Sequence, residues 1–197
     1  MSTPTSAAPA DKFTVLGKLA WLWMNSPLHH PWPVDLLSGF ALPPIELGQY
    51  LLLEREGLPV AYCSWAHLDS RAEAAYMLDP SRIALADWNG GDHLWFVDWV
   101  APFGKADSLA LKSRLEELFP TSVARAIRVK QGSKSGRVME FRGPQTDRRA
   151  TQALLAGYYR DFLASIDAQK TQVRMKKKDG HAARAIETAL QEEESAA

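Results

Sequence analysis

Apolar side chains recur every three or four residues in three stretches of this chain, with polar residues between them. This spacing gathers the apolar side chains on one side of a helix, so each stretch is predicted to be an amphipathic helix. The three stretches are Val15–Met24, Leu109–Leu118 and Gln152–Ala168. A fourth helix is predicted over Ala72–Leu85.

Aromatic and branched residues are concentrated in five other stretches, which we predict to be strands. These are Tyr50–Glu54, Val60–Ala66, Trp95–Ala101, Ala124–Val129 and Arg137–Phe141. Glu56-Gly57 predicts a hairpin turn between the first two strands, and a loop with Gly132 and Gly136 joins the last two. Because strands and helices are interspersed, the fold class is α/β or α+β, a sheet with helices packed on it.

The composition changes near both ends of the chain. Residues 1–12 begin with small and polar side chains and are predicted to be a flexible arm, and residues 13–167 are predicted to form one domain. Beyond them, large apolar side chains become rare while lysine, arginine and glutamate gather in blocks. Residues 168–197 are therefore predicted to be a charged tail, helical or disordered. The alternative is a basic arm for an acidic partner.

Composition narrows the class of protein. The 197 residues, 46% of them hydrophobic, suit a single globular domain. The 23 basic and 23 acidic side chains cancel, so the positive field of a typical nucleic-acid binder is missing and no nucleic-acid partner is expected. The single cysteine, the lack of a signal-type start and the short apolar runs predict a cytoplasmic protein with no membrane span.

His29 is the first candidate for chemistry, because imidazole exchanges protons near neutral pH. Ser26 precedes it by three residues, which brings the two side chains to the same side of one helical turn. Pro31 and Pro33 restrict the backbone that follows. The neighbouring His30 competes for the same role, and spacing does not separate the two histidines. Either could instead be an ordinary surface or core histidine.

Asp98 is the second candidate, because it interrupts the apolar run from Trp95 to Ala101. A carboxylate is almost never buried without a partner, so a partner is expected. In the functional interpretation that partner is a histidine, which the carboxylate orients and stabilises when protonated. The structural interpretation pairs Asp98 with an arginine such as Arg125 or Arg128, or leaves it on an exposed strand face.

Other candidates are weaker. Ser64 lacks the flanking glycines of a nucleophile elbow, and Cys63 lies in an apolar strand as a core residue would. His67 and His93 lack companions at metal-ligand spacing, so no metal site is predicted. No phosphate-binding or dinucleotide-binding glycine loop occurs in the sequence.

Several unusual, tryptophan-rich motifs resemble the toxin-activating lysine acyltransferases that accompany RTX protein toxins, the hemolysin-activating type. The similar segments span roughly residues 15 to 165. They include Trp21-Leu22-Trp23, Ser26-Pro27-Leu28-His29, Pro59-Val60-Ala61-Tyr62-Cys63-Ser64-Trp65-Ala66, Asp98-Trp99 and Ala101-Pro102-Phe103-Gly104. The tail after Asp167 departs from the family pattern.

The resemblance implies a mixed sheet flanked by helices, similar to the Gcn5-related acetyltransferases. It implies a cytoplasmic enzyme that transfers a fatty acyl group from acyl-carrier protein to internal lysines of an RTX protoxin, without a bound cofactor. The family's essential residues fall on His29 and Asp98, and Ser26 contributes less. The family varies at the position of His30. Members associate as dimers, so a homodimer is one expectation.

The chemistry of lysine acylation fits these residues. A free lysine amine is neutral at pH 7 only about once in 2,500, a cost of about 4.6 kcal/mol, so a base must take its proton. His29 suits that role, with Asp98 holding the ring. A second route makes His29 the nucleophile that carries the acyl group, and the sequence leaves direct and two-step transfer open.

An acidic acyl-carrier protein would be steered by a basic face on this chain. The candidate docking residues are Arg128, Lys130, Lys134 and Arg137, around the loop between the last two strands. Two other functions stay open, a coenzyme-A-dependent acetyltransferase of the same fold and a non-catalytic chaperone that binds the toxin. The first is weakened because the sequence lacks the usual pyrophosphate-binding glycine motif in register.

Overall fold

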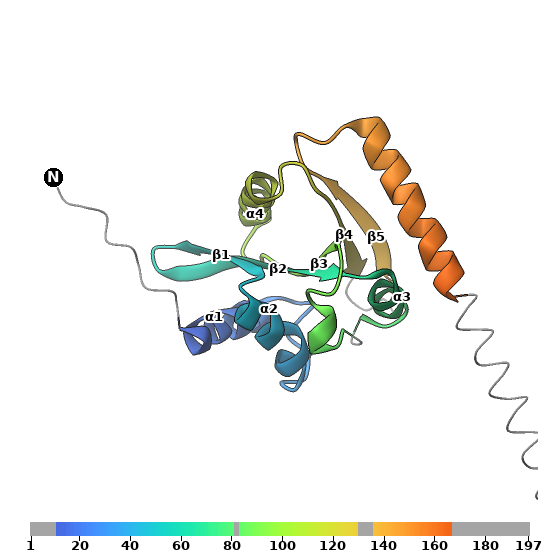
Figure 1. Cartoon of the computed structure of the whole chain (residues 1–197). Coiled ribbons are helices and arrows are strands. Elements are labelled where there is room, and N and C mark those ends of the chain that lie inside the picture. Colours follow the sequence, from blue (N-terminus) through green and yellow to red (C-terminus); the bar gives the residue numbers. More distant parts are fainter. Residues whose placement is uncertain (1–10, 81–82, 130–135, 167–197) are drawn as a thin grey trace, which may run out of the picture.

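A computed structural model describes residues 11–80, 83–129 and 136–166. Residues 1–10 of the predicted arm at 1–12, the predicted tail at 168–197 and the loop lysines Lys130 and Lys134 lie outside the described residues. The last two residues of the predicted arm are instead part of the first helix, since Asp11 caps it and Lys12 begins it. The described part is a mixed α/β structure in which helices flank a five-stranded sheet, as the sequence predicts (Figure 1). This arrangement is compatible with the fold of the Gcn5-related acetyltransferases.

The five strands follow one another across the sheet in chain order. They are β1 (Tyr50–Arg55), β2 (Leu58–Leu68), β3 (His93–Val100), β4 (Val123–Val129) and β5 (Gly136–Arg142). All neighbours pair antiparallel except β3 and β4, which are parallel. A two-residue turn joins β1 to β2, and both of its residues, Glu56 and Gly57, have positive φ angles, as such hairpin turns require. All five predicted strands and the hairpin are confirmed.

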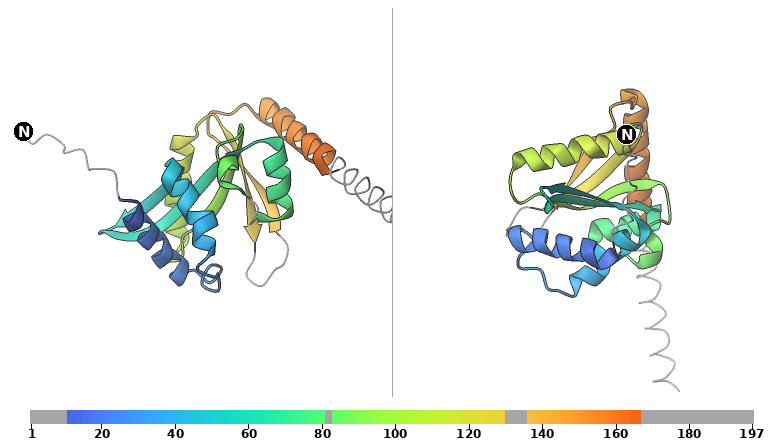
Figure 2. Two further views of the ribbon diagram at one scale, coloured as in Figure 1. Left: turned by 60° about the horizontal axis from the view of Figure 1, so that its bottom comes forward. Right: turned by 90° about the vertical axis from the view of Figure 1, so that its left-hand side faces the viewer.

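Helices cover both faces of the sheet. α1 (Lys12–Asn25), α2 (Leu42–Leu47) and α3 (Ser70–Leu78) lie on one face, and α4 (Lys105–Leu118) lies on the other (Figures 1 and 2). A further helix runs over residues 148–166 beside β5. Its buried side chains, Thr151, Leu155 and Tyr158, recur at helical spacing, which explains the predicted amphipathic pattern.

Two helical segments differ from the prediction. α3 ends at Leu78, well before the predicted end at Leu85, because Pro80 restricts Asp79 to an extended backbone with φ −151° and ψ 102°. Residues 37–47, for which no element is predicted, form a short π-helix (Leu37–Ala41) that continues into α2. Pro43 and Pro44 stand in the first turn of α2, where a missing N–H breaks no helical hydrogen bond.

Strand β2 divides the core between the two faces of the sheet. Its residues alternate, with Tyr62 and Ala66 packing toward α1 and α3 and Ala61 and Cys63 toward α4. Both layers are apolar and buried, so β2 is covered on both of its faces. No helix within the described residues is long and apolar enough to cross a membrane.

Candidate active site

The turn that follows α1 directs the side chain of His29 into the protein interior. Ser26 ends the helix, and its carbonyl oxygen accepts hydrogen bonds from the backbone N–H groups of His29 at 3.0 Å and His30 at 2.8 Å. The His29 carbonyl in turn accepts from the N–H of Trp32 at 2.8 Å. This compact turn leaves His29 only 4% exposed, whereas His30 faces solvent. Burial therefore separates the two histidines that their spacing in the sequence leaves equivalent.

A bulge in β3 turns Asp98 toward the same place. Ser64 of β2 pairs with Asp98, but the next residue, Trp65, pairs with Phe96, so Val97 is an extra residue without a partner on β2. A β-bulge changes the direction in which the following side chain points. Regular alternation would put Asp98 on the α4 face with Phe96. The bulge puts it on the α1 face instead.

Ser26, His29 and Asp98 form one continuous string of buried side chains. The Ser26 hydroxyl lies 2.7 Å from His29 Nδ1, and His29 Nε2 lies 3.0 Å from Asp98 Oδ1. All three residues are less than 10% exposed. When Asp98 is ionised it accepts the proton of Nε2, so Nδ1 keeps its lone pair and accepts a hydrogen bond from Ser26. In the neutral ring these two contacts select the tautomer that carries its proton on Nε2.

Two tryptophans enclose the histidine ring. Trp23 stacks on His29 with ring centres 5.7 Å apart and an angle of 20° between the planes. Trp32 meets the ring edge-on at 4.5 Å. The Trp23 indole N–H also donates to Asp98 Oδ2 at 2.9 Å. The sequence analysis does not predict these contacts, although Trp23 precedes Ser26 by about one helical turn.

His29 and Asp98 form part of the wall of a cavity of about 950 Å³. β3 and β4 pair only between Leu94–Phe96 and Ala124–Ala126, and the cavity lies beyond that point, between residues 97–99 and 127–129. Its size is at the upper end of the range of about 300–1,000 Å³ for small-molecule sites. Most of its lining is apolar and includes Leu28, Trp32, Phe40, Phe96, Ala126 and Phe141.

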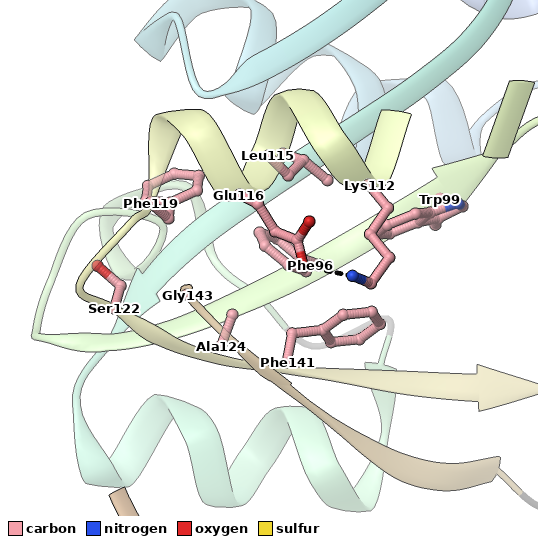
Figure 3. A pocket seen from close by; sticks show the side chains of 10 residues that line it. All are labelled: Phe96, Trp99, Lys112, Leu115, Glu116, Phe119, Ser122, Ala124, Phe141 and Gly143. Carbon is pink, nitrogen blue, oxygen red and sulfur yellow. Dashed lines mark hydrogen bonds and ion pairs between the residues drawn. The ribbon is translucent and has the colours of Figure 1, made fainter. Parts of the chain in front are cut away.

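A small recess lies between α4 and the sheet. It shares Phe96, Trp99, Lys112 and Phe141 with the lining of the main cavity. Figure 3 shows Lys112 and Glu116 extending from α4 over the aromatic floor that Phe96 and Phe141 provide. The two charged side chains form an ion pair with each other. Lys112 also lines the main cavity, so the wall that α4 contributes to this cavity carries a positively charged side chain.

The negative charge of Asp98 acts on neighbouring acids in the core. Burial, together with the Asp98 carboxylate, raises the pKa of Tyr62 and of Cys63 well above their usual ranges. The same two causes, burial first, raise the pKa of Tyr76, which lines the cavity. These three groups therefore stay protonated at neutral pH.

Arg125 does not pair with Asp98. Its guanidinium pairs with Glu73, which is fully buried and also accepts hydrogen bonds from Trp95 Nε1 at 2.6 Å and His93 Nδ1 at 3.0 Å. Burial lowers the pKa of Arg125, and the Glu73 carboxylate opposes that shift. The structural interpretation of Asp98 as the partner of Arg125 is therefore wrong, since a second, separate cluster holds this arginine.

The predicted docking residues are placed only in part. Arg128 and Arg137 lie directly opposite each other on β4 and β5, and both are exposed. Lys130 and Lys134 belong to the residues that the structure does not describe. Arg128 lines the cavity, so the described half of the predicted basic face adjoins the site.

The weaker candidates lie in the core. Cys63 and Ser64 are completely buried in β2, so neither is presented to the cavity as a nucleophile would be. His67 is half-buried, and burial lowers its pKa. Within residues 11–80, 83–129 and 136–166, no group of three His, Cys, Asp or Glu side chains is arranged to hold a metal ion.

Comparison with known proteins identifies the family. The sequence model of the RTX toxin acyltransferase family matches residues 8–142. A protein-lysine palmitoyltransferase, CyaC, of Bordetella bronchiseptica is 47% identical over 165 residues, 84% of this chain and 89% of that protein. A protein-lysine myristoyltransferase, RtxC, of Kingella kingae is 43% identical over 159 residues, 81% of this chain and 94% of that protein.

The myristoyltransferase HlyC of Escherichia coli is 41% identical over 152 residues, 77% of this chain and 88% of that protein. These relatives identify the chain as an acyltransferase, and the buried histidine–carboxylate pair beside the large cavity is its candidate active site. The chain belongs to the RTX toxin acyltransferase family. The resemblance seen in the sequence motifs is confirmed.

Proposed function

We propose that this protein transfers a fatty acyl group from acyl-carrier protein to the ε-amino group of internal lysines in an RTX protoxin, and so activates the toxin. The observation that carries the proposal is the buried Ser26–His29–Asp98 string in the wall of a mostly apolar cavity. The relatives named as lysine palmitoyl- and myristoyltransferases support the choice of acyl group and acceptor.

His29 is proposed as the general base. Its Nδ1 carries the available lone pair, because Nε2 faces the Asp98 carboxylate at 3.0 Å. In the reaction Nδ1 takes one proton from the lysine ammonium. The neutral amine attacks the thioester carbon and the carbon–sulfur bond breaks. The nitrogen gives a second proton to the leaving sulfur, so the carrier leaves as its thiol and the lysine becomes an amide. Asp98 stabilises the imidazolium that forms.

Ser26 has the lesser role in this proposal. Its hydroxyl occupies His29 Nδ1 at 2.7 Å, so it either turns aside for the substrate or passes the proton on. In the alternative two-step route, His29 itself is acylated before the lysine attacks. Rapid quenching of enzyme and acyl-carrier protein without protoxin separates the two routes, since only the two-step route gives an acylated enzyme.

The donor is proposed to approach on the α4 side of the sheet. Arg128 and Arg137 face each other across β4 and β5, and like charges directly opposite each other are unfavourable unless an anion lies nearby. They share a strand face with Ala126 and Met139, which line the cavity. An acidic carrier protein would supply the missing negative charge.

The cavity is proposed to hold the thioester and the adjoining acyl chain. Its volume of about 950 Å³ and its aromatic and aliphatic lining suit a long hydrocarbon chain. We further propose that the reaction takes place in the cytoplasm, where acyl-carrier protein is available, without a bound cofactor, and that the enzyme can act as a homodimer.

Mass spectrometry of the co-expressed protoxin tests the proposed function. We expect lysine residues that carry a fatty acyl group when the protein is present and unmodified lysines when it is absent. Acetylated lysines that depend on coenzyme A would favour the coenzyme-A-dependent acetyltransferase. A protoxin that is bound and protected but unmodified would favour the non-catalytic chaperone. Either result would overturn the proposal.

A further inference from the structure

The geometry points to Trp23 as a positioning residue that fixes Asp98, and through it the tautomer of His29. The inference rests on the proposed function for its effect on rate, but its structural part stands on contacts alone. Trp23 contacts both members of the pair, because its indole N–H donates to Asp98 and its ring stacks on His29. It reaches them from the end of α1, one turn before Ser26.

The first step concerns the carboxylate of Asp98. Its two oxygens have separate partners, with Oδ1 on His29 Nε2 at 3.0 Å and Oδ2 on the Trp23 indole N–H at 2.9 Å. A carboxylate with one partner can rotate about the bond to its Cβ atom, whereas two partners in different directions fix its plane. The side chain of Asp98 is 2% exposed, so water does not easily replace the indole.

The second step concerns the histidine ring. The Trp23 indole stacks on it at 5.7 Å with nearly parallel planes. Trp23 therefore limits both the tilt of the imidazole and the direction of the carboxylate that it faces. A carboxylate held beside Nε2 selects the tautomer that is protonated on Nε2 and unprotonated on Nδ1. Without the indole N–H the carboxylate is no longer held in that direction, so both tautomers should form.

A tryptophan in this place could also serve packing alone, because it belongs to the apolar cluster between α1 and the sheet. The packing role and the positioning role of Trp23 are abolished by different changes to its side chain. Packing depends on the size of the ring, but positioning depends on the N–H group. The informative change replaces Trp23 with β-(3-benzothienyl)alanine, in which sulfur takes the place of the N–H and the ring keeps its size.

Two measurements test the inference. Nitrogen NMR of His29, assigned by the signals lost in His29→Gln, should show one tautomer in the natural protein and a mixture in the analogue. In acyl transfer, kcat should fall about 10-fold in the analogue and in Trp23→Phe, while KM for acyl-carrier protein stays within twofold. Trp21→Phe is the matched control, because Trp21 lies on the outer side of the same helix and is 44% exposed.

The outcomes separate this inference from the proposed function. An unchanged His29 tautomer in the analogue, or an unchanged kcat, overturns the positioning role of Trp23. A natural protein that transfers no acyl group overturns the proposed function, while the NMR measurement still decides the inference. If Trp23→Phe fails to fold, the analogue supplies both measurements, since it preserves the packing.

Discussion

The side chains of His29 and Asp98 meet at 3.0 Å, although 69 residues separate them in the sequence. Two local irregularities bring them together. The turn after α1 directs His29 inward, and the extra residue Val97 in β3 moves Asp98 to the α1 face of the sheet. The site therefore lies where a helix end and a strand bulge face each other, beside the cavity.

Asp98→Asn is expected to lower the rate of acyl transfer by at least about 100-fold, the lower end of what a positioned acid or base contributes. The amide keeps the volume of the carboxylate but cannot stabilise an imidazolium in the same way. The initial rate with purified acyl-carrier protein and protoxin measures this loss. Circular dichroism should show a folded protein, and a rate within threefold of the natural enzyme would contradict the role given to Asp98.

Charge reversal at Arg128 and Arg137 is expected to raise KM for acyl-carrier protein about 10-fold at low salt while kcat changes little. The reason is the loss of attraction to an acidic partner, an effect that salt screens. Arg149→Glu is the matched control, because Arg149 is exposed at the start of the helix over residues 148–166. An unchanged KM for Arg128→Glu/Arg137→Glu at low salt would remove the proposed docking face.

Periodicity predicts the helices, whereas the strands are predicted from their composition and the turns between them. β2 lies between two apolar layers, so it appears in the sequence as a run of apolar and aromatic residues and not as an alternating pattern. The helical segment over residues 37–47 is not predicted from the sequence, because Pro43 and Pro44 resemble residues that end a helix. In the structure they occupy the first turn of α2. The β-bulge at Val97 is not predicted from the sequence either, because an additional residue within an apolar strand produces no distinct sequence pattern.

The site was predictable in its residue types but not in its contacts. Ser26 and His29 are close in sequence, so their proximity follows from one turn. The partner of Asp98 depends on packing between segments that are far apart in the sequence. Both His29 and Arg125 could pair with a carboxylate, so the sequence does not choose between them. Only the three-dimensional structure assigns Arg125 to Glu73 and Asp98 to His29.

The cluster around Glu73 is expected to matter for stability. Glu73→Ala leaves the buried Arg125 guanidinium unpaired and should lower the free energy of unfolding by about 3–5 kcal/mol. Urea unfolding followed by circular dichroism measures the loss. The double variant Glu73→Leu/Arg125→Met should lose less than the sum of the two single changes, because it leaves no lone buried charge. Strict additivity of the two losses would show that the pair is not coupled.

Cys63 is expected to be inert in the folded protein. Burial raises the pKa of its thiol, so little thiolate is present at pH 8. Ellman's reagent should therefore react slowly until urea unfolds the chain. Since the unfolded thiol ionises near pH 8.5 and the folded thiol does not, the free energy of unfolding should fall as pH rises through that range. Rapid labelling of folded protein at pH 8 would contradict this burial.

The neighbouring histidines allow the central claim to be tested within one turn of the chain. His29 is buried against Asp98, whereas His30 is exposed. The decisive measurement is the initial rate of acyl transfer from acyl-carrier protein to protoxin for His29→Gln and His30→Gln, both verified as folded. We predict a loss of at least about 1,000-fold for the first, within the range of general acid–base catalysis, and a rate within about threefold of the natural enzyme for the second. A His29→Gln variant that keeps more than a tenth of the natural rate would contradict the account.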